Sequence, residues 1–190
     1  MNILEAYVKK YNQIIILVIG MPCSNKSDIA KELKIDLDLP IININNYLFK
    51  NKFKEVEFDG VKFKIRDDTE NYNWDKFNKD VGELKSSGVI IYGNYIDSSK
   101  IDFNIDFSFF YSLNVNLCQK ILSEKKLLNI SDAEEKKIYF EKIFNPKYLE
   151  LKTNIKFNKF FNIKENTVFS ASYDEIFDLL MELIKSKLKQ

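Results

Sequence analysis

The sequence contains no histidine and only two cysteines, Cys23 and Cys118. Without histidine the chain has no imidazole general base, no histidine-ligated metal ion and no histidine-based catalytic triad. The two cysteines match no zinc-binding or redox spacing, so we expect reduced thiols in an intracellular protein. The sole arginine is Arg66. Any chemistry therefore falls to carboxylates, hydroxyls, amides and lysines.

Long hydrophobic runs and an excess of one charge are also missing. The 190 residues carry 29 basic and 28 acidic side chains, a net charge of +1, so no broad field attracts nucleic acid or an anionic membrane. The apolar run at residues 14–19 is too short for a signal-peptide core or a membrane span. We expect a single domain over residues 1–190 in the cytoplasm of its host cell, with no nucleic-acid or membrane partner and with a homo-oligomer left open.

The same apolar run leads into the most informative segment of the chain. Residues Gly20 to Ser27 read GMPCSNKS, and a helical pattern follows from Asp28 to Lys34. The order of strand, loop and helix, and the spacing, match the P-loop pattern G-x-x-x-x-G-K-[ST], with Asn25 in place of the second glycine. Asparagine suits that position, because it is among the residues other than glycine that adopt left-handed backbone conformations.

A P-loop binds polyphosphate through three kinds of group. Main-chain N–H groups and the helix N-terminus surround the oxygens, Lys26 neutralises the β- and γ-phosphates, and the Ser27 hydroxyl coordinates Mg²⁺. We therefore predict ATP and Mg²⁺ as cofactors. The predicted nucleotide-binding residues are Gly20, Met21, Pro22, Cys23, Ser24, Asn25, Lys26, Ser27 and Asp28. The alternative interpretation is an ordinary turn, because a short pattern with one mismatch also arises by chance.

Hydrophobic periodicity predicts the surrounding fold. We expect helices around residues 3–11, 74–84, 115–128 and 173–184, and strands at 41–44, 89–92, 107–111 and 167–169. Alternating residues on both sides of Asp59-Gly60 predict a β-hairpin. The alternation of strands and helices favours a three-layer α/β fold with a mainly parallel central sheet, helices on both faces and the hairpin as an excursion. Ligands of such sheets bind beyond the carboxyl ends of the strands.

Several motifs resemble the uridine kinase and phosphoribulokinase family of P-loop kinases. A family stretch of the I-S-x-D-x-F-Y type corresponds to ININNY at residues 42–47, which places Asn45 where the family has aspartate. The sequence NYNWD at 71–75 is similar to the family motif that opens a helix, and IYGN at 91–94 places Tyr92 where glutamate is usual. The arginine-rich lid helix corresponds to residues 118–126, which offer lysines only. The resemblance covers most of Gln13 to Lys185.

This resemblance implies a P-loop NTPase-like fold and the transfer of the ATP γ-phosphate to a nucleoside hydroxyl. Lys26 and Asn45 would then be catalytic, with Asn45 orienting the hydroxyl. The residues implied in substrate binding are Asn45, Tyr47, Tyr72 and Tyr92, and those implied in Mg²⁺ binding are Ser27 and Asp97. For Asp97 a loop cap is an equal alternative.

The replacement of aspartate by Asn45 raises the question of a general base, because an amide accepts no proton at neutral pH. The carboxylates near the expected site are Asp59, Asp67, Asp68 and Asp97. For the pair Asp67-Asp68 we favour a solvated turn.

Two hypotheses of different classes remain. The first is an ATP-dependent nucleoside kinase, which the retained Lys26-Ser27 pair favours. The second is a catalytically degenerate kinase fold that binds nucleotide and acts as a structural or interaction protein. The simultaneous loss of the expected aspartate, glutamate and lid arginines favours this second hypothesis.

Overall fold

The structure is a computed structural model that describes residues 2–124, 130, 132–163 and 169–190, with side chains described up to residue 163 and from residue 172 onward. Its helices are α1 Ile3–Tyr11, α2 Lys26–Leu37, α3 Trp74–Leu84, α4 Val115–Glu124, α5 Ala133–Tyr139, α6 Asn145–Asn154 and α7 Phe169–Lys189. Its strands are β1 Ile15–Gly20, β2 Ile41–Asn43, β3 Lys54–Phe58, β4 Val61–Ile65, β5 Val89–Gly93, β6 Phe107–Leu113 and β7 Lys159–Ile163. Within the described residues, no helix is both long and apolar enough to cross a membrane.

Strand β1 lies at the centre of a five-stranded sheet with the order β2-β5-β1-β6-β7. All neighbouring strands run parallel, and Leu17 of β1 lies opposite Ile91 of β5 and Ser108 of β6. Every residue of β1 is buried. A parallel strand covered on both faces reads as a continuous apolar run, which is why the sequence identifies this strand well.

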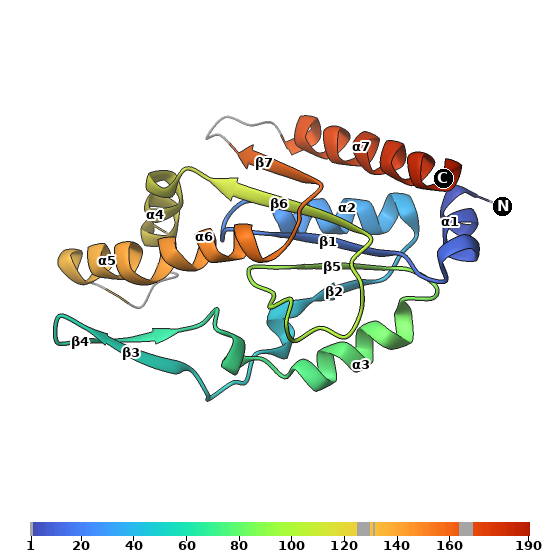
Figure 1. Cartoon of the computed structure of the whole chain (residues 1–190). Helices are drawn as coiled ribbons and strands as arrows, with labels where there is room; N and C mark the ends of the chain where they lie inside the picture. Colours follow the sequence, from blue (N-terminus) through green and yellow to red (C-terminus); the bar gives the residue numbers. More distant parts are fainter. Residues whose placement is uncertain (1, 125–129, 131, 164–168) are drawn as a thin grey trace.

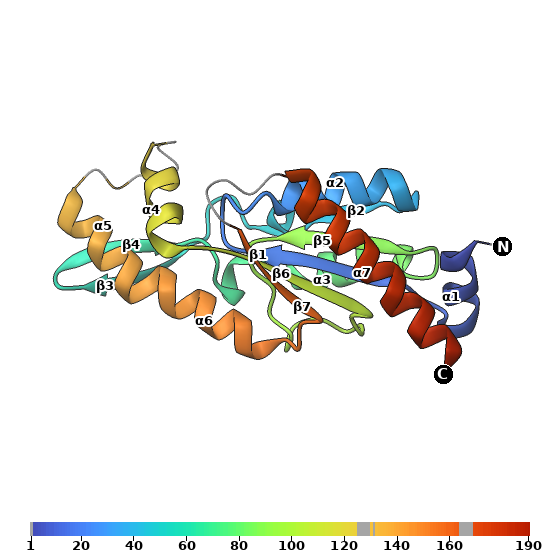
Figure 2. The ribbon, with the colours of Figure 1, turned by 90° about the horizontal axis from the view of Figure 1, so that it is seen from above.

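Helices cover both faces of the sheet, as Figure 1 and Figure 2 show. On one face Ile16 belongs to a core that includes buried residues of α1, α2 and α7. On the other face Leu17 belongs to a core that includes buried residues of α3, α4 and α6. The alternating apolar side chains of the strands therefore pack against the apolar stripes of the helices in two cores, one on each face of the sheet. The predicted three-layer α/β architecture is confirmed.

The predicted hairpin is confirmed as the two-stranded sheet β3–β4, which stands apart from the main sheet. Asp59 and Gly60 both have positive φ, 50° and 78°, as a two-residue hairpin turn of this kind requires. The buried Asn71 fixes the base of the hairpin: its side chain accepts from the Lys54 N–H at 3.0 Å and donates to the Ile65 carbonyl at 2.6 Å. In Figure 1 the hairpin extends from the same end of the molecule as the carboxyl ends of β1 and β6.

The last strand of the sheet differs from the prediction. It is β7, Lys159–Ile163, and Phe169, which was predicted to be in a strand, begins α7. The other two residues of the predicted strand, 167 and 168, lie outside the described residues. At this edge of the sheet only Phe161 is buried, so the strand carries little of the apolar signal that marks a central strand.

The helical segment from α5 to α6 was not predicted. A π-helical turn, Phe140–Phe144, joins the two helices. Helix α5 is rich in Lys and Glu and has no buried residue, which removes the apolar stripe that reveals a helix in a sequence. The segment adds Tyr148 and Leu151 to the core on the α3 side of the sheet.

Candidate functional site

The predicted phosphate loop connects the carboxyl end of β1 to the start of α2. Gly20 lies so close to β6 that a Cβ atom built on it would be 1.9 Å from the Tyr111 carbonyl oxygen. The next residue fixes the same contact, because the Met21 N–H donates to that oxygen at 2.9 Å. Only glycine fits this approach of two backbones, so the first glycine of the motif has a direct structural reason.

Two residues inside the loop have left-handed backbones. The φ angles of Cys23 and Asn25 are 63° and 58°. Asn25 is the N-cap residue of α2, and its side chain forms no capping hydrogen bond. Asparagine thus supplies the backbone conformation for which the motif normally uses glycine, in agreement with the sequence-based expectation.

The start of α2 presents a row of free main-chain donors. Among the described residues, the N–H groups of Ser24, Asn25, Lys26 and Ser27 have no hydrogen-bond acceptor, whereas those of Asp28 and Ile29 bond to the Asn25 carbonyl. The first N–H groups of a helix have no partner inside the helix, and the helix dipole adds partial positive charge there. Such a row of donors is a binding site for an anion.

Lys26 lies within this loop. Its side chain is 7% exposed, and its ammonium group donates to the Met21 carbonyl at 2.8 Å. The Ser24 hydroxyl donates to the same oxygen at 2.7 Å. Burial lowers the pKa of Lys26 to about 8, although the charge of Asp67 acts in the opposite direction. A bound anion would strongly stabilise the charged form of this buried lysine, because few protein groups compensate for its loss of hydration.

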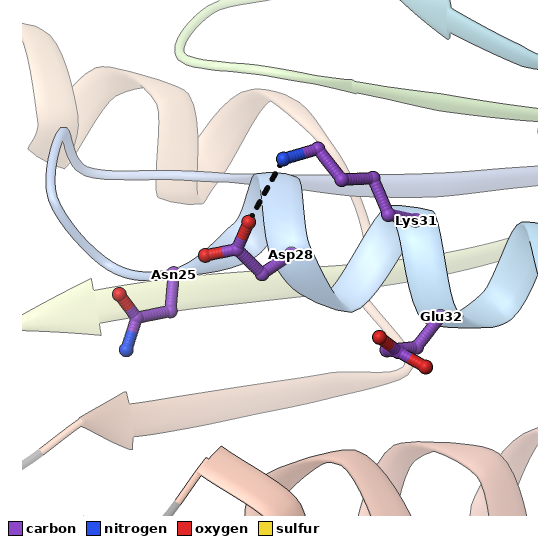
Figure 3. Close-up of a pocket in the computed structure, with 4 residues that line it drawn as sticks. All are labelled: Asn25, Asp28, Lys31 and Glu32. Carbon is purple, nitrogen blue, oxygen red and sulfur yellow. Dashed lines mark hydrogen bonds and ion pairs between the residues drawn. The ribbon is translucent and has the colours of Figure 1, made fainter.

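The Ser27 hydroxyl and the Asp28 carboxylate, at the start of α2, have different surroundings. Ser27 is partly exposed and, within the described part of the chain, its hydroxyl makes no hydrogen bond, so it is available to a metal ion. Asp28 forms an ion pair with Lys31 at 3.0 Å. Asp28 and Lys31 line a hollow of about 330 Å³ with Asn25 and Glu32, shown in Figure 3. With two carboxylates and one lysine, this hollow carries an excess of negative charge and is unsuitable for a phosphate.

Asn45 lies in the 3₁₀ turn Ile44–Tyr47, directly after β2. Its side-chain oxygen is buried and has no hydrogen-bond partner among the described residues. It lies against β5, because a Cβ built on Gly93 would be 3.6 Å from it. An unpaired buried acceptor costs about 1–3 kcal/mol.

The three predicted substrate-binding tyrosines lie in different environments. Tyr47 donates to Asp80 at 2.7 Å, and the buried Tyr72 donates to Asp67 at 3.2 Å. Both belong to the face of the sheet that carries Asn45. Tyr92 belongs to the opposite face, which α2 covers. The structure therefore brings Asn45 and Tyr72 to one side of the sheet and leaves Tyr92 on the other.

Asp97, the predicted metal ligand, follows β5 in a short loop. Its carboxylate accepts from the Ser99 N–H at 2.9 Å and from the Ser99 hydroxyl at 2.7 Å. These contacts are those of a loop cap. In the part of the chain that is described, no group of three or more Asp, Glu, Cys or His side chains could hold a metal ion.

The interpretation of Asp67 and Asp68 as a solvated turn is wrong. Asp68 is only 7% exposed, and its carboxylate lies 3.5 Å from the Lys54 ammonium and 3.9 Å from that of Lys147. Asp67 is partly buried, and it accepts from the Tyr72 hydroxyl at 3.2 Å and from the Tyr148 hydroxyl at 3.5 Å. Apart from Tyr72, these partners come from β3 and α6, so the local sequence gives no signal of them.

Comparison with known proteins identifies the fold. The sequence matches no protein-family model and no curated protein. A protein named as a fructose transport system kinase from Silicibacter sp. TM1040 aligns with a TM-score of 0.54 at 11% identity, over 85% of this chain and 99% of that chain. The YorR protein of Bacillus subtilis, in complex with phosphorylated GDP, aligns with a TM-score of 0.52 at 17% identity, over 90% and 96% of the two chains. Shikimate kinase from Acinetobacter baumannii, in complex with shikimate, aligns with a TM-score of 0.51 at 14% identity, over 92% and 97%.

The chain has the fold of P-loop kinases. The P-loop kinase fold agrees with the predicted fold class and with the position of the loop at the carboxyl end of the central strand. The narrower resemblance to uridine kinase and phosphoribulokinase stays a prediction, because these similarities concern the fold alone.

Proposed function

We propose that the protein is an ATP-dependent phosphotransferase that acts on a hydroxyl group of a small molecule. The observation that carries this proposal is the group of unpartnered amides from Ser24 to Ser27 around the buried ammonium of Lys26. These donors fit the phosphates of a nucleotide. For Mg²⁺ the loop offers one protein ligand, the Ser27 hydroxyl, and the nucleotide phosphates would supply further oxygens.

In this function the loop amides, Lys26 and Asn45 each have a separate role. The amides and Lys26 hold the β- and γ-phosphates in place, and Lys26 stabilises the negative charge that spreads over the transferred phosphoryl group. Bound Mg²⁺ neutralises further charge on the same phosphates. The side-chain amide of Asn45 orients the acceptor hydroxyl through a hydrogen bond.

For the acceptor of the phosphoryl group, our specific proposal is a nucleoside. The family resemblance, carried by ININNY at residues 42–47 and NYNWD at 71–75, supports a nucleoside. Proteins of this fold also include a shikimate kinase, so non-nucleoside acceptors belong in the same test.

A second candidate function is a nucleotide-binding protein without transferase activity. Asn45 in place of aspartate favours it, because phosphoryl transfer to a hydroxyl normally uses a carboxylate to accept the proton. Lysine in place of the lid arginines favours it too, since lysine lacks the bidentate geometry that arginine offers to phosphate. Of these lysines Lys120 lies on α4, and Lys125 and Lys126 lie outside the described residues.

The decisive experiment combines binding with product formation. Wild-type protein is incubated with Mg-ATP and with uridine, cytidine, shikimate or fructose, and the products are followed by ³¹P NMR. Thermal unfolding with and without Mg-ATP reports binding, and a nucleotide at about a hundred times its Kd stabilises the native state by about 2.7 kcal/mol. Lys26→Ala removes the phosphate ligand, and Lys31→Ala is the matched control on the exposed side of the same helix.

We expect stabilisation and product with the wild type and Lys31→Ala, and neither with Lys26→Ala. Stabilisation by Mg-ATP without any product would favour the nucleotide-binding protein. Equal behaviour of wild type and Lys26→Ala in both measurements would refute the proposed phosphate site.

A further inference from the structure

Asp67 follows the hairpin in the sequence, shortly after the end of β4 at Ile65. The segment that contains it is fixed to the residues after β2 by backbone hydrogen bonds. The Asn73 N–H donates to the Tyr47 carbonyl at 2.8 Å, and the Phe49 N–H donates to the Asn71 carbonyl at 2.8 Å. Leu48 and Tyr72 form an antiparallel bridge between the same two segments. The segment that follows Asp67 is therefore anchored to the turn Ile44–Tyr47, which carries Asn45.

The carboxylate of Asp67 is held by two tyrosines from different parts of the chain. Tyr72, on its own segment, donates to one oxygen at 3.2 Å, and Tyr148 of α6 donates to the other at 3.5 Å. Tyr72 and Tyr148 are 3% and 6% exposed, so their hydroxyls have little freedom to turn elsewhere. Each carboxylate oxygen keeps a further lone pair that can accept a hydrogen bond.

The charge of Asp67 also acts on the phosphate loop. It is the strongest electrostatic partner of Lys26, and the attraction is mutual, since each charge favours the ionised form of the other. The groups that act on Asp67 are Arg66, Tyr72, Lys26 and Tyr148. Burial raises the pKa of Asp67 against these opposing contacts. A carboxylate whose pKa moves towards neutrality is a better general base than an exposed one.

We propose that Asp67 is the general base of the transfer reaction, a catalytic role that rests on the proposed function and that replaces the aspartate missing at position 45. Asn45 orients the acceptor hydroxyl, and a carboxylate oxygen of Asp67 accepts its proton. The acceptor oxygen forms a bond to the γ-phosphorus while the bond between that phosphorus and the β–γ bridging oxygen breaks. The products are the phosphorylated acceptor and ADP, and Asp67 then releases the proton to water.

The test uses Asp67→Asn in the full chain. This substitution keeps the shape and one acceptor oxygen for the tyrosines and removes the charge and the basic group. Asp59→Asn is the matched control, because it makes the same change on the exposed hairpin turn, where asparagine also tolerates the positive φ of 50°. Turnover of Mg-ATP is measured by ³¹P NMR with the acceptor panel above and with water alone, and Mg-ATP binding is measured by calorimetry.

We expect Asp67→Asn to lower kcat at least about 100-fold, the lower end of the usual contribution of a general base, with Mg-ATP affinity changed less than about threefold. The wild-type rate should fall with unit slope below the pKa of Asp67, and this limb should be missing from the residual rate of Asp67→Asn. A ¹³C NMR titration of the Lys26 side chain should give a lower pKa in Asp67→Asn than in Asp59→Asn.

The outcomes separate this inference from the proposed function. An active wild type together with an equally active Asp67→Asn would overturn the role of Asp67 and leave the phosphotransferase intact. An unchanged Lys26 pKa in Asp67→Asn would show that the Asp67 carboxylate does not act on the phosphate loop, and would overturn the inference. An inactive wild type with every acceptor and with water would refute the phosphotransferase, and the role of Asp67 with it.

Discussion

Lys26→Met is expected to stabilise the unliganded protein while it abolishes nucleotide binding. The pKa of Lys26 falls from 10.5 to about 8 in the native state. At about 1.4 kcal/mol for each pKa unit, holding the charged amine in the loop costs about 3 kcal/mol at neutral pH. Methionine keeps the apolar stem and removes the charge. The lost hydrogen bond to the Met21 carbonyl, 2.8 Å long, offsets about 1 kcal/mol of this gain.

The expected net effect is an increase of about 2 kcal/mol in the free energy of unfolding at neutral pH. Between about pH 8 and pH 10.5 the unfolded chain binds more protons at this lysine than the native state, so wild-type stability rises with pH in that window. The advantage of Lys26→Met should therefore shrink to below about 1 kcal/mol near pH 9.5.

Urea denaturation followed by far-UV circular dichroism, without nucleotide, measures both quantities. Lys34→Met is the matched control, because Lys34 is exposed on the same helix and its substitution should change the unfolding free energy by less than about 0.5 kcal/mol. A loss of about 1 kcal/mol or more in Lys26→Met at neutral pH, with the control unchanged, would refute the reasoning. It would mean that the ammonium is well compensated in the unliganded loop.

Two further substitutions test the framework around the loop. Gly20→Ala should destabilise the protein by more than about 3 kcal/mol, because its Cβ would lie 1.9 Å from the Tyr111 carbonyl oxygen. The control Gly82→Ala in α3, whose Cβ would meet nothing within 4 Å, should be neutral or slightly stabilising. Similar urea midpoints for the two variants would contradict the close approach of Gly20 to Tyr111. Asn71→Ala leaves the Lys54 N–H and the Ile65 and Arg66 carbonyls without their partner and should lower the free energy of unfolding by about 2–4 kcal/mol. Faster hydrogen exchange confined to β3 and β4 would confirm that these hydrogen bonds hold the hairpin. Unchanged stability would contradict this role of Asn71.

The phosphate loop could be predicted because all of its determinants are contiguous. The apolar run of β1, the motif from Gly20 to Ser27 and the helix after it follow one another in the sequence, so local patterns are sufficient. The hairpin is equally local, since Asp59-Gly60 alone fixes its turn. In both cases the physical cause lies within a few residues of its effect.

The acceptor side of the site could not be predicted in the same way. Asp67 looks solvated in the sequence, and only tertiary contacts bury it. Tyr148, which holds one of its oxygens, is 81 residues away along the chain. The edge strand β7 was misplaced for a related reason, because burial of Phe161 alone against β6 leaves too weak a local signal.

The hairpin described above shares no strand pairing with the main sheet within the described residues, and the buried amide side chain of Asn71 holds its base through hydrogen bonds to both strands. Residues can therefore be inserted at its tip without displacing one hydrogen bond of the five parallel strands. Changes at the hairpin tip therefore leave the strands that position the phosphate loop unaltered. Under the proposed function, insertions there could alter which acceptor binds while the proposed nucleotide site stays unchanged.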